Sequence, residues 1–461
     1  MDKRSLKVQN LILLIASYYF YSCWDYRFLF LLIFSTFLDY YTGIKISDST
    51  NNREKKIWFW TSVLTNIGFL AIFKYFNFFA NSFKDALLQV GLSVDPWILN
   101  VILPVGISFY TFHGLSYVID IYKDRIKPEI DFINYSLFVS FFPLLVAGPI
   151  ERANHLLPQI IKKRTFNYFK AVDGLKQILW GFFKKIVVAD NCAEQVNLIF
   201  NDYSNLTGSH LALGAIFFSF QIYGDFSGYS DIAQGTARLF GIELLRNFAF
   251  PYFSRDVGEF WRRWHISLSS WFRDYLYIPL GGSKSSTTLK VRNTFIIFLV
   301  SGFWHGANWT FIAWGGLNAL YFLPLLLLKK NRANLDTVAA HRSYPSLSEL
   351  FNMLYTFSLI TIAWVFFRSD SIYDAVKYIG NMCKHPGSFL LFELYLLHIK
   401  IFAAIFILII IEWISRNDRY GIEKMLIKSS RFYKWSFYSV LLVLIFYMGN
   451  FEETNFIYFQ F

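Results

Sequence analysis

Apolar stretches long enough to cross a lipid bilayer recur from one end of this chain to the other. A bilayer core of about 30 Å requires roughly 20 helical residues. The candidate stretches run over residues 8–24, 28–44, 57–79, 97–122, 132–150, 172–189, 211–223, 294–304, 309–328, 350–367, 389–413 and 435–448. Several are short or contain Gly or Pro, and we expect some of these to be re-entrant. The sequence therefore predicts an all-α, polytopic integral membrane protein with roughly 10–12 transmembrane or re-entrant helices.

The composition excludes the common soluble classes. Charged residues make up 16% of the 461 positions, whereas soluble domains carry about 25%. An aromatic content of 21% excludes disorder, coiled coil and collagen. The net charge of +12 comes from Lys and Arg residues between the apolar stretches. This pattern predicts cytoplasmic loops facing the anionic headgroups of a lipid bilayer, and no nucleic-acid partner.

The three cysteines, Cys23, Cys192 and Cys383, lie far apart with no CxxC spacing. This spacing indicates neither a disulfide framework nor a thiolate zinc site, and it does not favour a catalytic cysteine.

Helix-breaking residues interrupt the apolar stretches. They are Pro104, Pro143, Gly148, Pro149, Gly224, Gly228, Pro279, Gly281 and Gly282. Backbone groups freed at membrane depth must find partners in the protein or in a water-filled cavity, so we expect a cavity within the membrane. Gly224 and Gly228 also have GxxxG spacing, which favours close helix packing.

The longest polar interval, residues 246–292, contains eight basic and three acidic residues, and Trp261, Trp264 and Trp271 recur through its middle. Basic residues and tryptophan are typical of the cytoplasmic interface of a membrane. The interval is therefore predicted to be an amphipathic or re-entrant segment on the cytoplasmic side.

His305 lies deep in the apolar sequence SGFWHGANW. An ionisable residue at membrane depth indicates a functional site, although a neutral histidine bonded between helices fits the same pattern. If the segment is helical, Asn308 at i+3 and Ser301 at i−4 share its face. A Ser301–His305 nucleophilic pair is geometrically allowed, but a helical serine more often bonds to a backbone carbonyl.

His265 lies in the sequence EFWRRWHISLSSWFRDY, between arginines and tryptophans. It is either functional or simply placed at the interface. A metal site built from His265 and His305 needs a third ligand, and the nearest acids, Glu259 and Asp274, have arginine neighbours. We therefore predict no metal.

Asp225 and Asp231 lie among apolar residues. They are either proton relays or structural acceptors, and the low number of acidic residues favours structural acceptors. His113, in FYTFHGLSYVIDIY, is ambiguous in the same way.

An aromatic tail, residues 451–461, ends in NFIYFQF. Aromatic residues after a span are typical of interfacial anchors. Tyr458 also carries a phenol that a nearby base can turn into an acyl-accepting nucleophile.

Six ordered blocks carry a family resemblance. They are LPVGISFYTFHGLSYVIDIY from Leu103, FFPLLVAGPIERA from Phe141, YGDFSGYSDIAQGTARLFGI from Tyr223, FWRRWHISLSSWFRDYLYIPLGG from Phe260, SGFWHGANWTFIAWG from Ser301, and the terminal FIYFQF. On these blocks the chain resembles the membrane-bound O-acyltransferases (MBOAT family) along nearly its whole length. It looks more like the branch of the alginate O-acetyltransferase membrane subunits than like the D-alanyl transfer proteins of teichoic acids.

The resemblance implies one membrane domain over residues 1–461, with helices around a central funnel or tunnel, in the bacterial cytoplasmic (inner) membrane. It implies a multi-pass O-acetyltransferase that relays acyl groups, expected to be acetyl, from a cytoplasmic thioester to a cell-envelope or exopolysaccharide. His305 matches the family's catalytic histidine, His265 its second histidine, and Tyr458 its C-terminal tyrosine motif.

The chemistry of such a transfer assigns further roles. His305 removes the proton of the acceptor oxygen, and Asn308 or His265 stabilises the oxyanion. Basic side chains of residues 246–292, among them Arg262, Arg263 and Arg273, attract the phosphates of the donor. The donor is expected to be acetyl-CoA or an acyl-carrier thioester, with no permanently bound cofactor.

Three partners are expected: an extracytoplasmic SGNH-type acetyltransferase or esterase-like protein, a polysaccharide acceptor, and a cytoplasmic acyl-donor protein. Two alternatives stay open. One is D-alanyl transfer to teichoic acids, and the other is a multi-span transporter or flippase, which the broken helices, Asp225 and Asp231 would also suit.

Overall fold

The computed structural model describes residues 4–100, 102–284, 286–384, 391–451 and 456–457, and these residues form helices and loops without a strand. The all-α prediction is confirmed. Contacts divide the chain into two compact units that alternate along the sequence. Unit 1 comprises Met1–Ala171 and Thr236–Leu245, and unit 2 comprises Val172–Gly235 and Arg246–Phe461.

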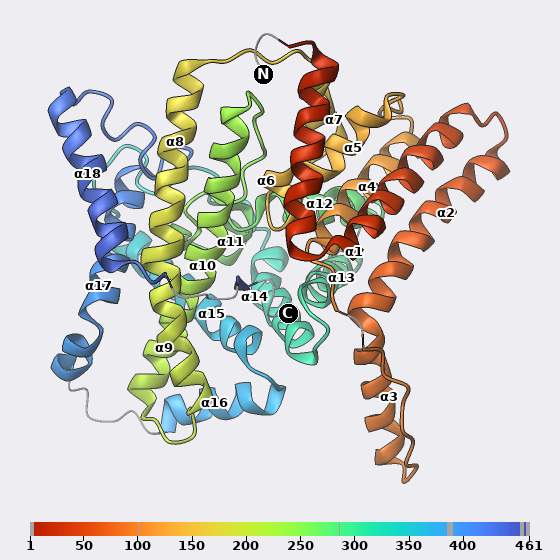
Figure 1. The fold of residues 1–461 in the computed structure, drawn as a ribbon. Coiled ribbons are helices and arrows are strands. Elements are labelled where there is room, and N and C mark those ends of the chain that lie inside the picture. The colour runs from red at the N-terminus through yellow and green to blue at the C-terminus, as the bar shows by residue number, and fades with distance from the viewer. Residues whose placement is uncertain (1–3, 101, 285, 385–390, 452–455, 458–461) are drawn as a thin grey trace. The chain divides into compact units, whose positions relative to one another are not determined.

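Unit 1 is built around the long helix α1, which packs against α2, α4 and α5 (Figure 1). Its helices are α1 (Leu6–Asp48), α2 (Asn52–Leu70), the π-helical turn η1 (Ala71–Tyr75), α3 (Phe76–Gln89), α4 (Ile107–Tyr122), α5 (Phe132–Ser140), α6 (Phe142–Leu145) and α7 (Ala153–Ile160). The backbone of α1 is broken at Asp25, with φ −158° and ψ 111°. This break separates the two predicted stretches 8–24 and 28–44.

Two predicted stretches of unit 1 are less helical than expected. Residues 97–122 become helical only at Ile107, because Pro104 and Gly106 precede it and Gly106 takes a left-handed φ of 76°. A side chain at Gly106 would meet the carbonyl oxygen of Leu145 at 2.2 Å. Residues 132–150 break at Phe141, one residue before α6 begins with Pro143 in its first turn.

Unit 2 holds the remaining helices. They are α8 (Tyr168–Phe182), the π-helix η2 (Phe183–Ala189), α9 (Asp190–Asn201), α10 (Gly208–Leu239), η3 (Pro251–Phe253), α11 (Val257–Arg263), α12 (Ile266–Phe272), the π-helix η4 (Arg273–Tyr277), η5 (Gly282–Lys284), α13 (Thr287–His305), α14 (Trp309–Leu327), α15 (Leu347–Arg368), α16 (Ile372–Lys384), α17 (Leu391–Ile414) and α18 (Arg431–Met448). The first residues of α8 and the last of α10 extend into unit 1.

Glycines bring α8 and α10 into close contact, and the two helices lie side by side in Figure 1. A side chain at Gly181 would meet the carbonyl oxygen of Gly228 at 2.6 Å, and one at Gly228 would meet that of Gly181 at 2.8 Å. The predicted packing role of Gly228 is confirmed, since α10 continues through this residue without a break.

Four helical stretches of the described residues are long and apolar enough to cross a membrane. They are Leu6–Asp48, Asn52–Gln89, Trp309–Leu327 and Leu347–Arg368. Two of them belong to each unit.

The basic, Trp-rich interval 246–292 is not one amphipathic helix. It forms the short elements η3, α11, α12, η4 and η5, and its last residues begin α13. Trp264 and Trp271 are buried. Burial of this kind fits the re-entrant form of the prediction better than a helix lying on the surface.

Candidate active site

His265 occupies a strained position between α11 and α12. Its backbone is left-handed, with φ 42° and ψ 55°. For a residue other than glycine this conformation costs about 1–2 kcal/mol and is typically retained where the surroundings impose it. Such strain points to a functional site.

Asn247 holds the backbone around His265. Its carbonyl oxygen accepts the N–H of Ile266 at 2.9 Å. Its side chain accepts the hydroxyl of Ser267 at 2.6 Å and donates to Ser230 on α10 at 3.0 Å. Asn247 thus fixes the turn at His265 to helix α10.

The imidazole of His265 is buried, with 2% of its surface exposed. Neither of its ring nitrogens has a hydrogen-bond partner in the part of the chain that the structure describes. Its ring packs edge-on against Phe226 of α10, with centroids 4.6 Å apart. A buried imidazole with both nitrogens unused is available to a bound group.

The structure brings the two predicted histidines to one place. The indole of Trp304 lies 6.2 Å from the ring of His265 and 4.9 Å from the ring of His305. His305 is the last residue of α13 and is also buried. Trp314 and Phe367 each lie 5.3 Å from its ring. The aromatic surroundings exclude water and strengthen electrostatic interactions with a reacting group.

The prediction that Asn308 lies on the same helical face as His305 is wrong. Helix α13 ends at His305, Gly306 is extended, and Asn308 begins α14 as its N-cap. The Asn308 side chain accepts the N–H of Thr310 and donates to the carbonyl oxygen of Asp370. Its amide is therefore engaged in the turn between the two helices. Ser301 does lie within α13, one turn before His305.

A basic cavity of about 520 Å³ lies beside α13 and α14. Its cationic lining residues are Arg273, Lys290, Lys329 and Arg332, and none of the described residues that line it is acidic. Ile297, Phe298, Phe322 and Leu326 form an apolar part. The size is typical of a small-molecule site, and the combination of cations with an apolar wall suits an anion that carries an uncharged arm.

Aromatic contacts connect this cavity to His305. Phe298 lines the cavity and lies 5.4 Å from Trp261. Trp261 lies 5.6 Å from Trp314, whose ring contacts His305. Lys290 and His305 lie near the two ends of α13, about 22 Å apart at the rise of 1.5 Å per residue.

Of the three predicted donor-binding arginines, only Arg273 lines the cavity. Arg262 donates to the carbonyl oxygens of Asn331 and Asn334 at 2.7 and 2.6 Å. It thereby fixes the loop that carries Asn331 and Arg332 to the cavity wall.

Arg263 pairs with the buried Glu259 at 2.8 Å and donates to the carbonyl oxygen of Asp336 at 3.1 Å. Arg255 also pairs with Asp336, which lowers the pKa of that carboxyl. Both arginines attach the same loop to α11.

Tyr458 lies outside the described residues, but the two residues before it are described. The main-chain N–H of Ile457 donates to the carboxylate of Asp225 at 2.7 Å. The ring of Phe456 lies 5.3 Å from that of Tyr229. Asp225 directly precedes Phe226, which contacts His265. Residues 456 and 457 are thus held on α10, next to the residue that packs on His265.

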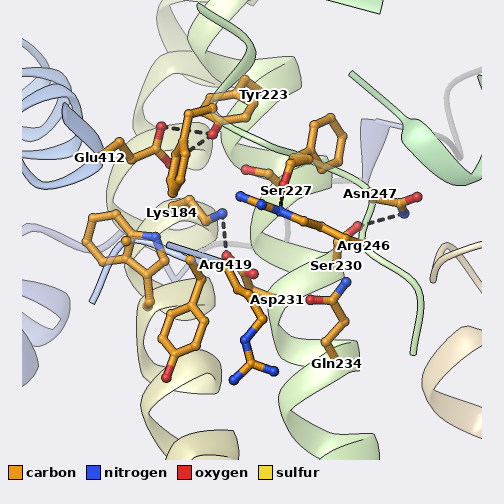
Figure 2. Close-up of a pocket in the computed structure, with 15 residues that line it drawn as sticks. Lys184, Tyr223, Ser227, Ser230, Asp231, Gln234, Arg246, Asn247, Glu412 and Arg419 are labelled. Atoms are coloured by element: carbon orange, nitrogen blue, oxygen red, sulfur yellow. Dashed lines mark hydrogen bonds and ion pairs between the residues drawn. The ribbon is translucent and has the colours of Figure 1, made fainter. Parts of the chain in front are cut away.

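Asp231 belongs to a second polar group in unit 2 (Figure 2). Its carboxylate pairs with Lys184 at 2.5 Å and accepts from Gln177 at 2.8 Å. In the same small cavity the hydroxyl of Tyr223 donates to Glu412 at 2.8 Å. Asp231 and Asp225 thus both accept bonds within unit 2, from lysine, glutamine and main-chain groups and not from the Arg or Tyr groups expected.

His113 belongs to unit 1, where it is fully buried. Its Nε2 accepts the main-chain N–H of Glu151 at 3.1 Å. The described residues contain no group of three His, Cys, Asp or Glu side chains that could hold a metal ion.

Comparisons with known proteins decide the family. Residues 122–368 match the membrane-bound O-acyltransferase family. The probable alginate O-acetylase AlgI of Pseudomonas aeruginosa is 38% identical over 368 residues, which are 79% of this chain and 68% of that protein. The chain belongs to the membrane-bound O-acyltransferase family. It is therefore an acyltransferase and an integral membrane protein, and this replaces the transporter alternative.

Other relatives of this membrane-bound O-acyltransferase act on different polymers. The peptidoglycan O-acetyltransferase of Helicobacter pylori is 35% identical over 82% of this chain and 74% of that protein. The teichoic acid D-alanyltransferase of Bacillus subtilis is 28% identical over 48% of this chain and 58% of that protein.

Sequence reasoning about this acyltransferase missed Lys184, Lys185 and Glu412. All three stand inside predicted apolar stretches, in FFKKIVV and IIIEWI. Isolated charges at membrane depth are the signal that would have found them. Asn247 carried no such signal, because a polar residue in a polar interval is ordinary.

Proposed function

We propose that the chain transfers acetyl groups from a cytoplasmic thioester to a cell-envelope or exopolysaccharide, acting from the bacterial cytoplasmic membrane. The observation that carries this proposal is the convergence of His265 and His305 on Trp304. The similarity to an alginate O-acetylase and a peptidoglycan O-acetyltransferase supports acetyl transfer to a polymer.

The basic cavity is the proposed site of the donor. Its four cations would bind the phosphates of coenzyme A or of a carrier-bound phosphopantetheine. The pantetheine arm would follow α13 past Phe298 and Trp261 toward His305. An extended arm has a length comparable to that helix. No cofactor needs to stay bound, because the thioester itself is the activated acyl group.

Two half-reactions follow. In the first, the phenol oxygen of Tyr458 attacks the thioester carbonyl, His305 accepts the phenolic proton, and the released thiolate takes that proton. The products are an acetyl-tyrosine ester and a free thiol. In the second, a hydroxyl of the acceptor attacks the ester, and the tyrosine regains a proton as it leaves.

His265 would donate to the developing oxyanion, since both of its ring nitrogens are unused in the described residues. Asn308 is a weaker candidate because its amide is engaged in the helix turn. An SGNH-type extracytoplasmic protein would complete delivery to the polysaccharide, and a cytoplasmic acyl-donor protein would supply carrier-bound acetyl groups.

The test uses the purified full chain in lipid nanodiscs with radiolabelled acetyl-CoA. We expect a covalent acetyl label on the wild type that is lost in Tyr458→Phe, which keeps the ring and removes the nucleophile. Full labelling and full transfer by Tyr458→Phe would rule out the tyrosine relay. If acetyl-CoA gives no label and an acetylated carrier protein does, the donor is the carrier protein.

A further inference from the structure

Three contacts attach the last part of the chain to η2, α9 and α10. The side chain of Asn191 donates to the carbonyl oxygen of Met448 at 2.8 Å. The N–H of Asn450 donates to the carbonyl oxygen of Ile186 at 3.2 Å. The third contact is that of Ile457 with Asp225. The chain thus returns to one surface at both described ends of the segment 449–457.

The Asp225 carboxylate is placed to accept a hydrogen bond from the tail. It is buried, with 3% of the residue exposed. Lys185 lies 2.7 Å from its Oδ1 atom, while its Oδ2 atom accepts the Ile457 N–H. Lys185 is itself held by Asp190 at 2.7 Å. The carboxylate is therefore charge-balanced on one side and offers a charge-assisted hydrogen bond on the other.

A buried ion pair is not needed to anchor an aromatic tail. An aromatic tail anchors to an apolar groove without charge, whereas a buried ion pair carries a desolvation cost. The carboxylate sets the register of the tail, because a hydrogen bond to a main-chain N–H fixes the position of one particular residue. The Phe456 ring against Tyr229 fixes the preceding residue.

We propose that Asp225, oriented by Lys185, is a positioning residue that sets the register of the tail beside His265. This inference rests on the proposed function, since register matters because Tyr458 follows Ile457 directly. Phe226, the residue after Asp225, contacts His265 at 4.6 Å. One turn of α10 therefore holds both the tail and the histidine.

The first experiment measures docking without any acyl chemistry. Ile457 is buried, with 1% exposed, so a cysteine placed there in a background lacking Cys23, Cys192 and Cys383 reports release of the tail through its maleimide labelling rate. The double variant Asp225→Leu/Lys185→Met removes both charges of the pair. Asp190 loses its lysine partner in this variant, and it loses the same partner in Asp225→Asn/Lys185→Gln, so a comparison of the two variants isolates the Asp225 acceptor. We expect labelling to become about tenfold faster or more, the ratio that corresponds to losing one charge-assisted hydrogen bond.

A matched control exists on the same helices. Lys184 and Asp231 form the neighbouring ion pair between η2 and α10. The variant Asp231→Leu/Lys184→Met should leave the labelling rate of the cysteine introduced by Ile457→Cys unchanged. The variant Asp225→Asn/Lys185→Gln keeps a side-chain acceptor and should restore slow labelling. Equal labelling of all variants and the parent protein overturns the proposal, and equal acceleration by both Leu/Met pairs does so as well.

The second experiment tests positioning itself. Asp225→Leu/Lys185→Met should lower kcat for transfer while the KM for the donor stays unchanged, and Asp225→Asn/Lys185→Gln should recover kcat. Normal kcat in a variant with fast labelling overturns the positioning role. If Tyr458→Phe is fully active, the relay fails, but the labelling experiment still decides whether Asp225 holds the tail.

Discussion

His265 and His305 lie against the same indole ring, that of Trp304, at centroid distances of 6.2 and 4.9 Å. His265 reaches this ring from a strained turn between two short helices, and His305 from the end of α13. The two histidines come from different elements and contact one buried aromatic ring, so they form a single site. The predictions for both histidines depend on this arrangement.

Replacement of His305 by Ala should lower acyl transfer at least about 100-fold, the contribution typical of a general base. The protein should remain in the membrane with an unchanged elution volume in size-exclusion chromatography. His341→Ala, at an exposed loop position, is the control and should retain full activity. Near-normal transfer by a well-expressed His305→Ala protein contradicts the assignment.

The effects of His265 and His305 should not add. Groups that act as a unit show a double variant no worse than the worse single variant. We therefore expect His265→Ala/His305→Ala to have the residual kcat of His305→Ala alone. Multiplicative losses in kcat would mean that the two rings act in separate steps.

Asn247→Leu should release the turn that holds His265. The change removes the side-chain bonds to Ser230 and Ser267, so thermal unfolding should report a loss of about 1–3 kcal/mol. Transfer should fall through kcat with little change in the donor KM. Ser267→Ala, which removes only one of these bonds, should show a smaller version of both effects.

The cations of the basic cavity should act on donor affinity. Arg332→Ala and Lys290→Ala should each raise the KM for acetyl-CoA about tenfold by removing a charge-assisted contact to phosphate, with kcat nearly unchanged. Lys428→Ala, an exposed position away from the cavity lining, serves as the control and should keep the donor KM of the wild type. A donor KM insensitive to both cavity changes would place the donor elsewhere.

The cavity should open toward the cytoplasm, because the basic interval follows the positive-inside bias. A cysteine at Lys284 or Lys290, in a protein without its native cysteines, should react with a membrane-impermeant maleimide only in inside-out vesicles. Labelling in intact cells would reverse the topology.

The membrane fold could be predicted because apolar length is a local property of the sequence, and α14 and α15 agree closely with the predicted stretches 309–328 and 350–367. A boundary failed where one backbone conformation decided it, as at Gly106. Helical spacing predicted that Asn308 lies beside His305. The chain instead turns at Gly306, and the Asn308 side chain caps the N-terminus of α14.

Within the site, His265 and His305 could be identified from their apolar or tryptophan-rich surroundings. Their shared contact with Trp304 could not, because it depends on how the turn at His265 packs against Trp304 of α13. The partners of Asp225 could not be predicted from the sequence either. One is Lys185 in the π-helix η2, and the other is the main-chain N–H of Ile457, which lies far along the chain.

Recognition of the tail through a main-chain N–H has a consequence for how its sequence can vary. Asp225 bonds to the backbone of residue 457 and not to a side-chain polar group, so apolar replacements of Ile457 that fit the same space keep the bond. An inserted or deleted residue between Gly449 and Phe456 would instead change the span between the two attachment points on η2 and α10. Natural variation in this segment should therefore preserve its length more strictly than its side chains.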